Sequence, residues 1–403
     1  MANQFSSILG NATGILKNWY QGPVVSQFND EIPFYREVEK GKDKYNGLQV
    51  VRPIKVRRNP GIGATSDGGT LPAIGTQTTQ QATITAKFNY LRFGLTGPML
   101  KASQGDKGAF ISAMEFEMSE GLNDLKFDVS RQLFWDGTGT LATVSANATA
   151  SNVITCTGRT SAEDGNKYLD VGMVIDIYTS AGVQVASAVA ITAISGTTTA
   201  TVTLSAAVTT SATDIIVRSG AYGNEVSGLR HTLDGGTSSI YGINRSTYQV
   251  FQGNVVNAAG GQLSLDLMQQ AFNSAKRRGG AKIDVVYCDY DSERAYNKLL
   301  IADKRYVGKV VGDGTFSDKD GSYLEFAGAK VVPDQNCTFD FYFIDSSHWK
   351  KYVLAELEWA DETGTFLIAQ TSSDSFEARL RLFFDFFCEK PSAEARLRNY
   401  ISP

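Results

Sequence analysis

The chain of 403 residues has few of the side chains that most often bind metals or form disulfides. It contains two histidines, His231 and His348, in separate segments, whereas a metal site needs clustered donors. Its four cysteines are scattered and show no CxxC spacing. We therefore expect no metal, no cofactor, histidines that are packed or on the surface, and buried, reduced thiols. The cysteines are Cys156, Cys288, Cys337 and Cys388.

The chain also lacks a long apolar run and a strong charge of either sign. No run of about 18 apolar residues occurs, so the sequence predicts no membrane span. The first residues, MANQF, lack the basic and apolar regions of a signal peptide, which favours a protein made and used in the cytoplasm. The formal net charge is −4, which gives no general argument for nucleic-acid binding.

Sequence motifs of catalysis are missing as well. No GxxxxGK[ST], GxSxG or HExxH pattern occurs, and the glycines at 61–63 lack the third glycine and the helix of a dinucleotide fingerprint. Residues 318–321 resemble part of a calcium loop, but the template puts Phe316 and Ala327 where carboxylates are required. The acidic group near residue 360 is typical of solvated charges at a strand end. Its members are Glu356, Glu358, Asp361 and Glu362. We therefore expect no enzyme.

What the sequence does contain is a long, exposed-looking β-hairpin. Its rising strand is predicted at residues 48–56 and its returning strand at 82–96, and about 25 polar residues separate them. Such a segment is too polar to pack a core of its own and needs something outside its domain to lie against. It also carries a local basic patch, Arg52, Lys55, Arg57 and Arg58. That patch is either a solvated loop or a contact for a neighbour's carboxylates or a nucleic-acid phosphate.

One long amphipathic helix follows the hairpin. Its apolar residues recur every three or four positions from Phe110 to Leu133, with Asp106 as the N-cap. A helix of this length is a rod of roughly 40 Å. Gly121 interrupts it near the middle and is a candidate bend, and the glycines of WDGTG at 135–139 end it.

The composition changes abruptly at residues 140–220, where Ala, Thr, Ser and Val dominate. Short alternating runs at 152–157, 173–178, 189–194, 201–204 and 214–218 predict a small β-sandwich or barrel. Helical and mixed α/β patterns surround this segment on both sides, which indicates an insertion.

Mixed α/β patterns fill the rest of the chain. Residues 1–44 indicate an arm with a short helix at 13–20. A helix is predicted from Ser264 to the glycines at 279–280, then a strand at 283–288 and a helix at 291–301. The tail returns to strands at 339–344 and 352–354 and to a long strand at 376–388, which we expect in a central sheet.

The order of these elements resembles the major capsid proteins of tailed bacteriophages, which have the HK97-type fold. Further similarity lies in short segments in the second half of the chain. These segments are GLRHTLD at 228–234, YGINRSTY at 241–248, QGNV at 252–255, FAGAKVVPD at 326–334, FIDSSHW at 343–349 and EWAD at 358–361. No single segment is specific; the resemblance depends on their order over most of residues 40–395.

This resemblance implies an α+β, HK97-like capsid fold with an inserted all-β domain. The implied parts are an N-terminal arm at 1–44, an E-loop hairpin at 45–98, a spine helix of the peripheral (P) domain at 99–139, the inserted domain at 140–220, a P-domain segment and linker at 221–254, an axial (A) domain at 255–350, and C-terminal P-domain strands and tail at 351–403. The short arm suggests a separate scaffolding protein.

The implied function is assembly. Copies would form hexamers and pentamers of an icosahedral shell around double-stranded DNA, with each hairpin across the adjacent subunit. Arg52, Lys55, Arg57 and Arg58 would then contact a protein neighbour. The implied partners are further copies, a scaffolding protein, a portal, a decoration protein and packaged DNA through non-specific contacts, with no membrane. The location would be the virion, assembled in the cytoplasm of a bacterial host.

Three other functions remain open from the sequence. An encapsulin-like compartment shares this fold but packages protein cargo. A surface adhesin or glycan-binding protein would use residues 140–220 as its binding module, although it predicts a secretion signal. An enzyme of unrecognised type would need a set of catalytic polar side chains, and the sequence shows no pattern of this kind.

Overall fold

The computed structural model describes residues 32–96, 98, 107–160, 162–236, 238–304, 324–360, 368–369 and 373–401. They form two compact units. The first unit comprises Met1–Val50, Ile84–Leu133 and Lys350–Phe387, and the second comprises Val51–Thr83, Phe134–Trp349 and Cys388–Pro403. The helix predicted at 13–20, the N-cap Asp106 and the turn at 318–321 lie outside the described residues.

A five-stranded sheet forms the first unit. Its order is β1-β18-β20-β19, and β4 also pairs with β20. The strands are β1 (Glu39–Lys40), β4 (Lys87–Thr96), β18 (Trp349–Trp359), β19 (Ile368–Ala369) and β20 (Ser375–Cys388). Phe34 and Tyr35 of the short helix α2 (Pro33–Glu37) pack against Phe386 and Phe384, with ring centroids 5.3 Å apart in each pair. The long strand predicted at 376–388 is confirmed, and its aromatic end lies in the core because α2 covers it.

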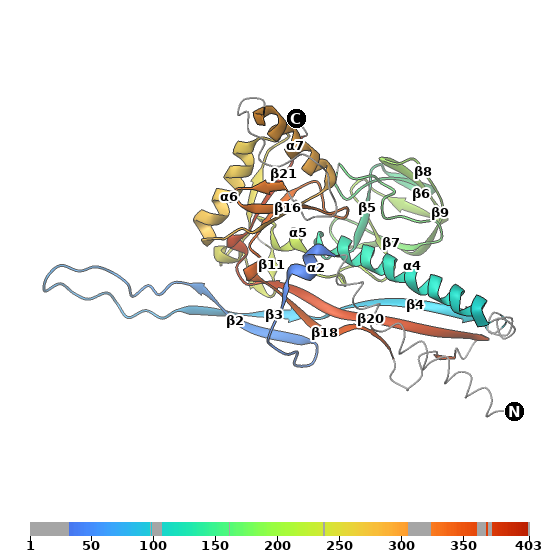
Figure 1. The fold of residues 1–403 in the computed structure, drawn as a ribbon, viewed down its shortest axis with the longest axis horizontal. Coiled ribbons are helices and arrows are strands. Elements are labelled where there is room, and N and C mark those ends of the chain that lie inside the picture. Colours follow the sequence, from blue (N-terminus) through green and yellow to red (C-terminus); the bar gives the residue numbers. More distant parts are fainter. Residues whose placement is uncertain are drawn as a thin grey trace. The chain divides into compact units, whose positions relative to one another are not determined.

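The long helix predicted after the hairpin is α4 (Lys107–Leu133), and it lies along β4 (Figure 1). Leu122, Leu125, Val129 and Leu133 are buried, as their spacing predicts. The Gln132 side chain donates a hydrogen bond to Asn89 Oδ1 of β4 at 2.9 Å. The helix ends two residues before the Asp136–Gly137 turn, in which Gly137 has a φ of 79° that favours glycine.

The predicted hairpin exists, but its returning strand is not one element. Strand β2 (Gln49–Arg57) pairs with β3 (Thr78–Thr85), whereas β4 pairs with β20 in an antiparallel register from Lys87↔Phe384 to Thr96↔Ser375. The prediction of one strand over residues 82–96 is therefore wrong. The alternation of side chains continues through Ala86, so periodicity alone gives no sign that the strand changes partner there.

Residues of the composition-shifted segment form a closed barrel in the second unit (Figure 1). Its strand order is β10-β5-β6-β9-β8-β7. The strands are β5 (Thr140–Val144), β6 (Ala148–Thr157), β7 (Val174–Tyr178), β8 (Gln184–Ser195), β9 (Thr199–Thr210) and β10 (Ile215–Arg218). Five of them overlap predicted runs; β5, directly after the turn at Gly139, is the sixth. Alternating small β-branched residues favour such a closed sheet, which leaves no open edge.

A six-stranded sheet with two helices makes up the other large part of the second unit. Its order is β13-β21-β17-β14-β16-β15. The strands are β13 (Asn254–Asn257), β14 (Val285–Cys288), β15 (Leu324–Phe326), β16 (Ala329–Pro333), β17 (Phe341–Ile344) and β21 (Ala395–Arg398). The helices are α6 (Leu265–Gly279) and α7 (Tyr290–Lys304), and Met268, Phe272 and Val286 lie in the shared core. Strand β21, grouped from the sequence with residues 351–403, thus pairs with strands from residues 254–344.

Helix α6 shows how local sequence sets its ends. The Ser264 Oγ accepts a hydrogen bond from the Leu267 amide at 3.2 Å, and Gly280 closes the helix with a φ of 67°. Its amide donates to the Lys276 carbonyl at 2.8 Å. The predicted helix from Ser264 to the glycines at 279–280 is confirmed, and the structure shows that Ser264 is its N-cap.

Short elements between the barrel and β13 are tied together by Arg245, whose side chain is fully buried. Its guanidinium donates to the backbone carbonyls of Ser238, His231 and Asp234 at 2.7, 3.0 and 2.9 Å. These elements are α5 (Leu229–Thr232), β11 (Ser239–Ile240), β12 (Ile243–Asn244) and η1 (Gln249–Phe251). Two further single turns are η2 (Ser346–His348) and η3 (Pro391–Ala393). One arginine with fixed, forked donors thus binds three backbone carbonyls at once.

A second buried arginine, Arg159, joins the barrel to the loop before β17. Its guanidinium lies 4.8 Å from the Trp135 ring centroid and 4.4 Å from that of Tyr168. It donates to Glu163 Oε1 at 2.6 Å and to the Asn336 carbonyl at 3.2 Å. Since the Arg159 side chain is fully buried, its charge depends on these partners for compensation.

Arg159→Met should therefore destabilise the chain by about 3 kcal/mol, because it leaves the Glu163 carboxylate buried without its main partner. Urea unfolding of the unassembled chain measures this. Replacing both residues, with Glu163→Leu, should recover part of the loss. A single variant within about 0.5 kcal/mol of the wild type would contradict the assigned role.

Candidate assembly surface: the arm and the helix–strand layer

The arm, defined here as Val51–Thr83, consists of most of β2 and β3 and the segment 58–77 that joins them. Residues 62–71 are all exposed, because Gly, Thr and Ser dominate there. At the tip, the Gly69 amide donates to the Ser66 carbonyl at 2.9 Å, and Gly68 has a φ of 70°. The arm therefore turns in a tight β-turn that requires a glycine.

Below the tip, two glycines let the two halves of the arm approach closely. A Cβ at Gly75 would lie 2.6 Å from the Gly61 amide nitrogen and 2.4 Å from Asn59 Oδ1. The same Asn59 oxygen accepts a hydrogen bond from the Gly61 amide at 2.8 Å. Only glycine fits at 75 without moving backbone atoms, so the arm has a defined, narrow neck despite its lack of a core.

Three aliphatic side chains lie on the arm with almost no cover. Ile62, Leu71 and Ile74 are 84%, 79% and 102% exposed. Full burial of an aliphatic side chain contributes about 1.5–3 kcal/mol, so an arm that leaves three in water forgoes a large stabilisation. Their apolar surface is therefore open to a partner outside the chain. These three residues were not predicted from the sequence, in which isolated aliphatic residues within a polar segment were the available signal.

The root of the arm is held by contacts with other residues of the second unit. Arg52 forms an ion pair with Glu389 at 2.8 Å, and Arg57 lies 5.4 Å from the Tyr248 ring centroid. The Gln80 side chain donates to the Tyr248 hydroxyl at 3.0 Å. Of the four predicted contact residues, Arg52 is thus committed within its own chain, whereas Arg57 remains exposed. Whether they contact a neighbouring subunit stays a prediction.

Lys55 and Arg58 complete the predicted basic patch. Both are exposed, and within the described residues neither has an ion-pair partner. Their placement along β2 and just after it leaves their charges available to an outside surface. The sequence gave no sign that Arg52 has an ion-pair partner more than 300 residues away.

In the first unit, Gly121 lies where α4 meets β4. A Cβ at this position would lie 2.7 Å from Phe93 Cε1 and 3.3 Å from Leu91 Cδ2. The glycine therefore permits close contact between helix and strand. The bend expected at Gly121 from the sequence stays a prediction, and the contact with Phe93 adds a second reason for glycine.

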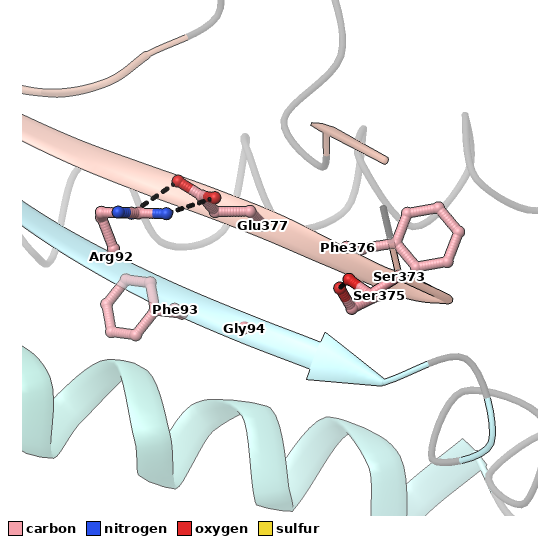
Figure 2. A pocket seen from close by; sticks show the side chains of 7 residues that line it. All are labelled: Arg92, Phe93, Gly94, Ser373, Ser375, Phe376 and Glu377. Atoms are coloured by element: carbon pink, nitrogen blue, oxygen red, sulfur yellow. Dashed lines mark hydrogen bonds and ion pairs between the residues drawn. The ribbon is translucent and has the colours of Figure 1, made fainter. Parts of the chain in front are cut away.

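The other face of β4 and β20 carries aromatic and charged side chains. Phe88 and Tyr90, 43% and 57% exposed, pack edge-on against Phe383 at 4.9 and 5.2 Å. Arg92 donates two hydrogen bonds to the Glu377 carboxylate, each 2.8 Å long (Figure 2). These bonds, followed by the bond from Arg379, lower the pKa of Glu377 to about 2.

This ion pair lines a pocket of about 440 Å³ at the end of β4, together with Ser373, Ser375 and Phe376 (Figure 2). The two serine hydroxyls bond to each other at 2.7 Å. The carboxylate is held by two arginines and is a poor base, so the pocket offers no nucleophile–base pair.

Metal-binding side chains do not gather in the part of the chain that the structure describes. The described residues hold no group of three or more His, Cys, Asp or Glu arranged for a metal. His231 is half-buried, and His348 Nε2 lies 3.8 Å from Asp345. All four cysteines are free and buried, which confirms that prediction. Burial raises the pKa of Cys156 to about 11 and raises the pKa values of Cys288, Cys337 and Cys388 well above the ordinary value. No described helix has the length and apolar composition to span a membrane.

Comparison with solved structures identifies the fold. The chain is similar to a chain of the cyanophage A-1(L) capsid asymmetric unit, with a TM-score of 0.55 and 12% identity over 90% of each chain. It is also similar to a chain of the capsid of a native GTA particle, with a TM-score of 0.50 and 9% identity over 91% of this chain and 89% of that one. No protein-family model and no curated protein matches the sequence. The chain thus has the α+β fold of phage capsid chains, and these similar structures are capsids rather than enzymes.

The contact at Gly121 predicts that Gly121→Ala destabilises the first unit by about 1–3 kcal/mol, because the added methyl group overlaps Phe93. Urea unfolding of the unassembled chain measures the change. Combining it with Phe93→Leu should recover most of the loss. A single variant as stable as the wild type would show that the ring moves aside without cost.

The Glu377 ion pairs predict a specific acid dependence. Because the folded pKa of about 2 lies below the ordinary value of 4.5, the carboxylate stabilises the fold fully above pH 4.5, and this contribution is lost as pH falls towards 2. Glu377→Gln should therefore be less stable than the wild type at pH 7. The difference, measured by urea unfolding, should shrink between pH 4.5 and 2. A constant difference across that window would rule out this origin.

Proposed function

We propose that this chain is the major capsid protein of a tailed bacteriophage. Copies of it assemble into hexamers and pentamers, which close into an icosahedral shell around double-stranded DNA in the virion. The single observation that carries the proposal is the arm, whose aliphatic residues Ile62, Leu71 and Ile74 are almost fully exposed. A neighbouring copy supplies the surface that buries them. The fold shared with phage capsid chains supports the same conclusion.

In this proposal each part of the chain has a place in an HK97-like subunit. The arm is the E-loop, α4 is the spine helix, and the sheet of the first unit belongs to the P-domain. The six-stranded sheet with α6 and α7 is the A-domain. The barrel of β5–β10 is an inserted domain, because it interrupts the chain directly after the spine helix.

Further partners follow from the same proposal. A separate scaffolding protein, a portal and a decoration protein would bind the shell, and packaged DNA would contact it without sequence specificity. The shell would form in the host cytoplasm. Gly121 would let α4 bend when the shell expands, and a Gly121→Ala variant that assembles and expands normally would count against that bend.

Substitutions of the exposed aliphatic residues of the arm should affect assembly without affecting folding. Replacing Ile62, Leu71 and Ile74 together by serine should leave the unfolding free energy of the unassembled chain within about 0.5 kcal/mol, because these side chains contact nothing in it. The yield of capsomers and shells should fall at least tenfold, because each interface loses three buried aliphatic groups. Size exclusion and electron microscopy measure the yield, with the scaffolding protein co-expressed where needed.

A matched control replaces two exposed barrel residues, Val171 and Val183, by serine. This variant should assemble like the wild type. Wild-type chains that remain uniform monomers under all these conditions would overturn the proposed function and would favour a surface binding protein. Shells that contain protein cargo and no DNA would favour an encapsulin-like compartment instead.

A further inference from the structure

The arm differs in charge from the chain that carries it. It holds four of the 38 basic residues but one of the 42 acidic residues, Asp67, whereas the whole chain has a net charge of −4. A basic arm on an acidic chain is attracted to acidic surfaces of other copies. The partner of the arm should therefore carry exposed carboxylates that have no cation of their own.

The cations available for such a contact lie near the arm's root. Arg52 already pairs with Glu389. Lys55, Arg57 and Arg58 are exposed, and their charges are not matched by a carboxylate among the described residues. Lys55 and Arg57 lie on the same face of β2, and Arg58 directly follows the strand, so the three cations fall within four consecutive positions.

A matching acidic group lies on the solvent side of α4. Glu120 and Asp124 are exposed, one turn apart, and neither has an ion-pair partner among the described residues. Like charges at this spacing repel each other and destabilise a helix. The next acid along, Asp128, is already bound by Arg131 at 3.1 Å. A cation from outside relieves the repulsion between Glu120 and Asp124.

The alternative docking face in the first unit has the wrong charge. The exposed side of β4 and β20 carries Arg92 and Arg379, whose side chains are 67% and 44% exposed. Their carboxylate partner, Glu377, is shared between them. A basic arm that approached this face would meet two further arginines, which disfavours it.

We propose that Lys55, Arg57 and Arg58 of one copy bind Glu120 and Asp124 on helix α4 of a second copy. This inference rests on the proposed function, since it names the surface that the arm contacts when copies assemble. Exposed ion pairs are individually weak, and one shell repeats this contact in every subunit.

Charge reversal with compensation tests the pairing. Lys55→Glu with Arg58→Glu, and separately Glu120→Lys with Asp124→Lys, should each lower the yield of capsomers and shells at least tenfold. Combining all four substitutions should restore the yield to within about threefold of the wild type. Thermal unfolding of the unassembled chain should change little in any variant, because all four side chains are exposed.

Two separate exposed acidic residues serve as the specificity control. Asp170→Lys with Glu325→Lys, at exposed positions elsewhere, should not rescue the arm variant. Equal rescue by this control would show a general charge effect and overturn the proposal. So would a four-residue variant no better than its parents. Arm variants that assemble normally but lose packaged DNA would also overturn it, because the arm would then bind phosphate. Wild-type chains that never assemble would instead refute the proposed function.

Discussion

The antiparallel pairing of β4 with β20 is the interaction on which the first unit depends. It joins residues 87–96 to residues 375–384 in one uninterrupted register. One face of this ladder receives α4 at Gly121, and the other presents Phe88 and Tyr90. Because β4 is committed to β20, the strand before it, β3, is left to pair with β2. The division of the predicted returning strand at Ala86 therefore follows from competition between two partners.

The arm that includes most of β2 and β3 has a defined shape, although the contacts that set this shape bury little apolar surface. Its shape comes from local devices: a glycine turn at the tip, the Gly61–Gly75 neck, and the contacts of Arg57 and Gln80 with Tyr248. None of these buries much apolar surface. The root of the arm is thus held by contacts within the chain, while Ile62, Leu71 and Ile74 stay exposed to water.

Local sequence signals predicted much of this architecture, but they did not predict contacts between residues that are far apart in the sequence. Helix α6 was predictable at both ends because Ser264 and Gly280 act within one turn of the backbone. The barrel was predictable as a β domain from alternation and composition. The pairing of Arg52 with Glu389 was not, because nothing in either segment points to the other. Gly121 shows the same limit: its sequence position suggests a bend, whereas its contact with Phe93 appears only when β4 is in place.

Charge and apolar surface have separable roles on the arm. Aliphatic burial is strong but has little directional preference, so in the proposed assembly Ile62, Leu71 and Ile74 supply affinity without selecting a site. Ion pairs between exposed groups contribute little energy, yet unlike charges select one face and like charges reject another. An arm with cations at its root and aliphatics towards its tip thus separates selection from affinity. Salt screens the ion pairs and leaves the aliphatic contacts in place. Raised ionic strength should therefore favour subunits with wrongly placed arms over free subunits.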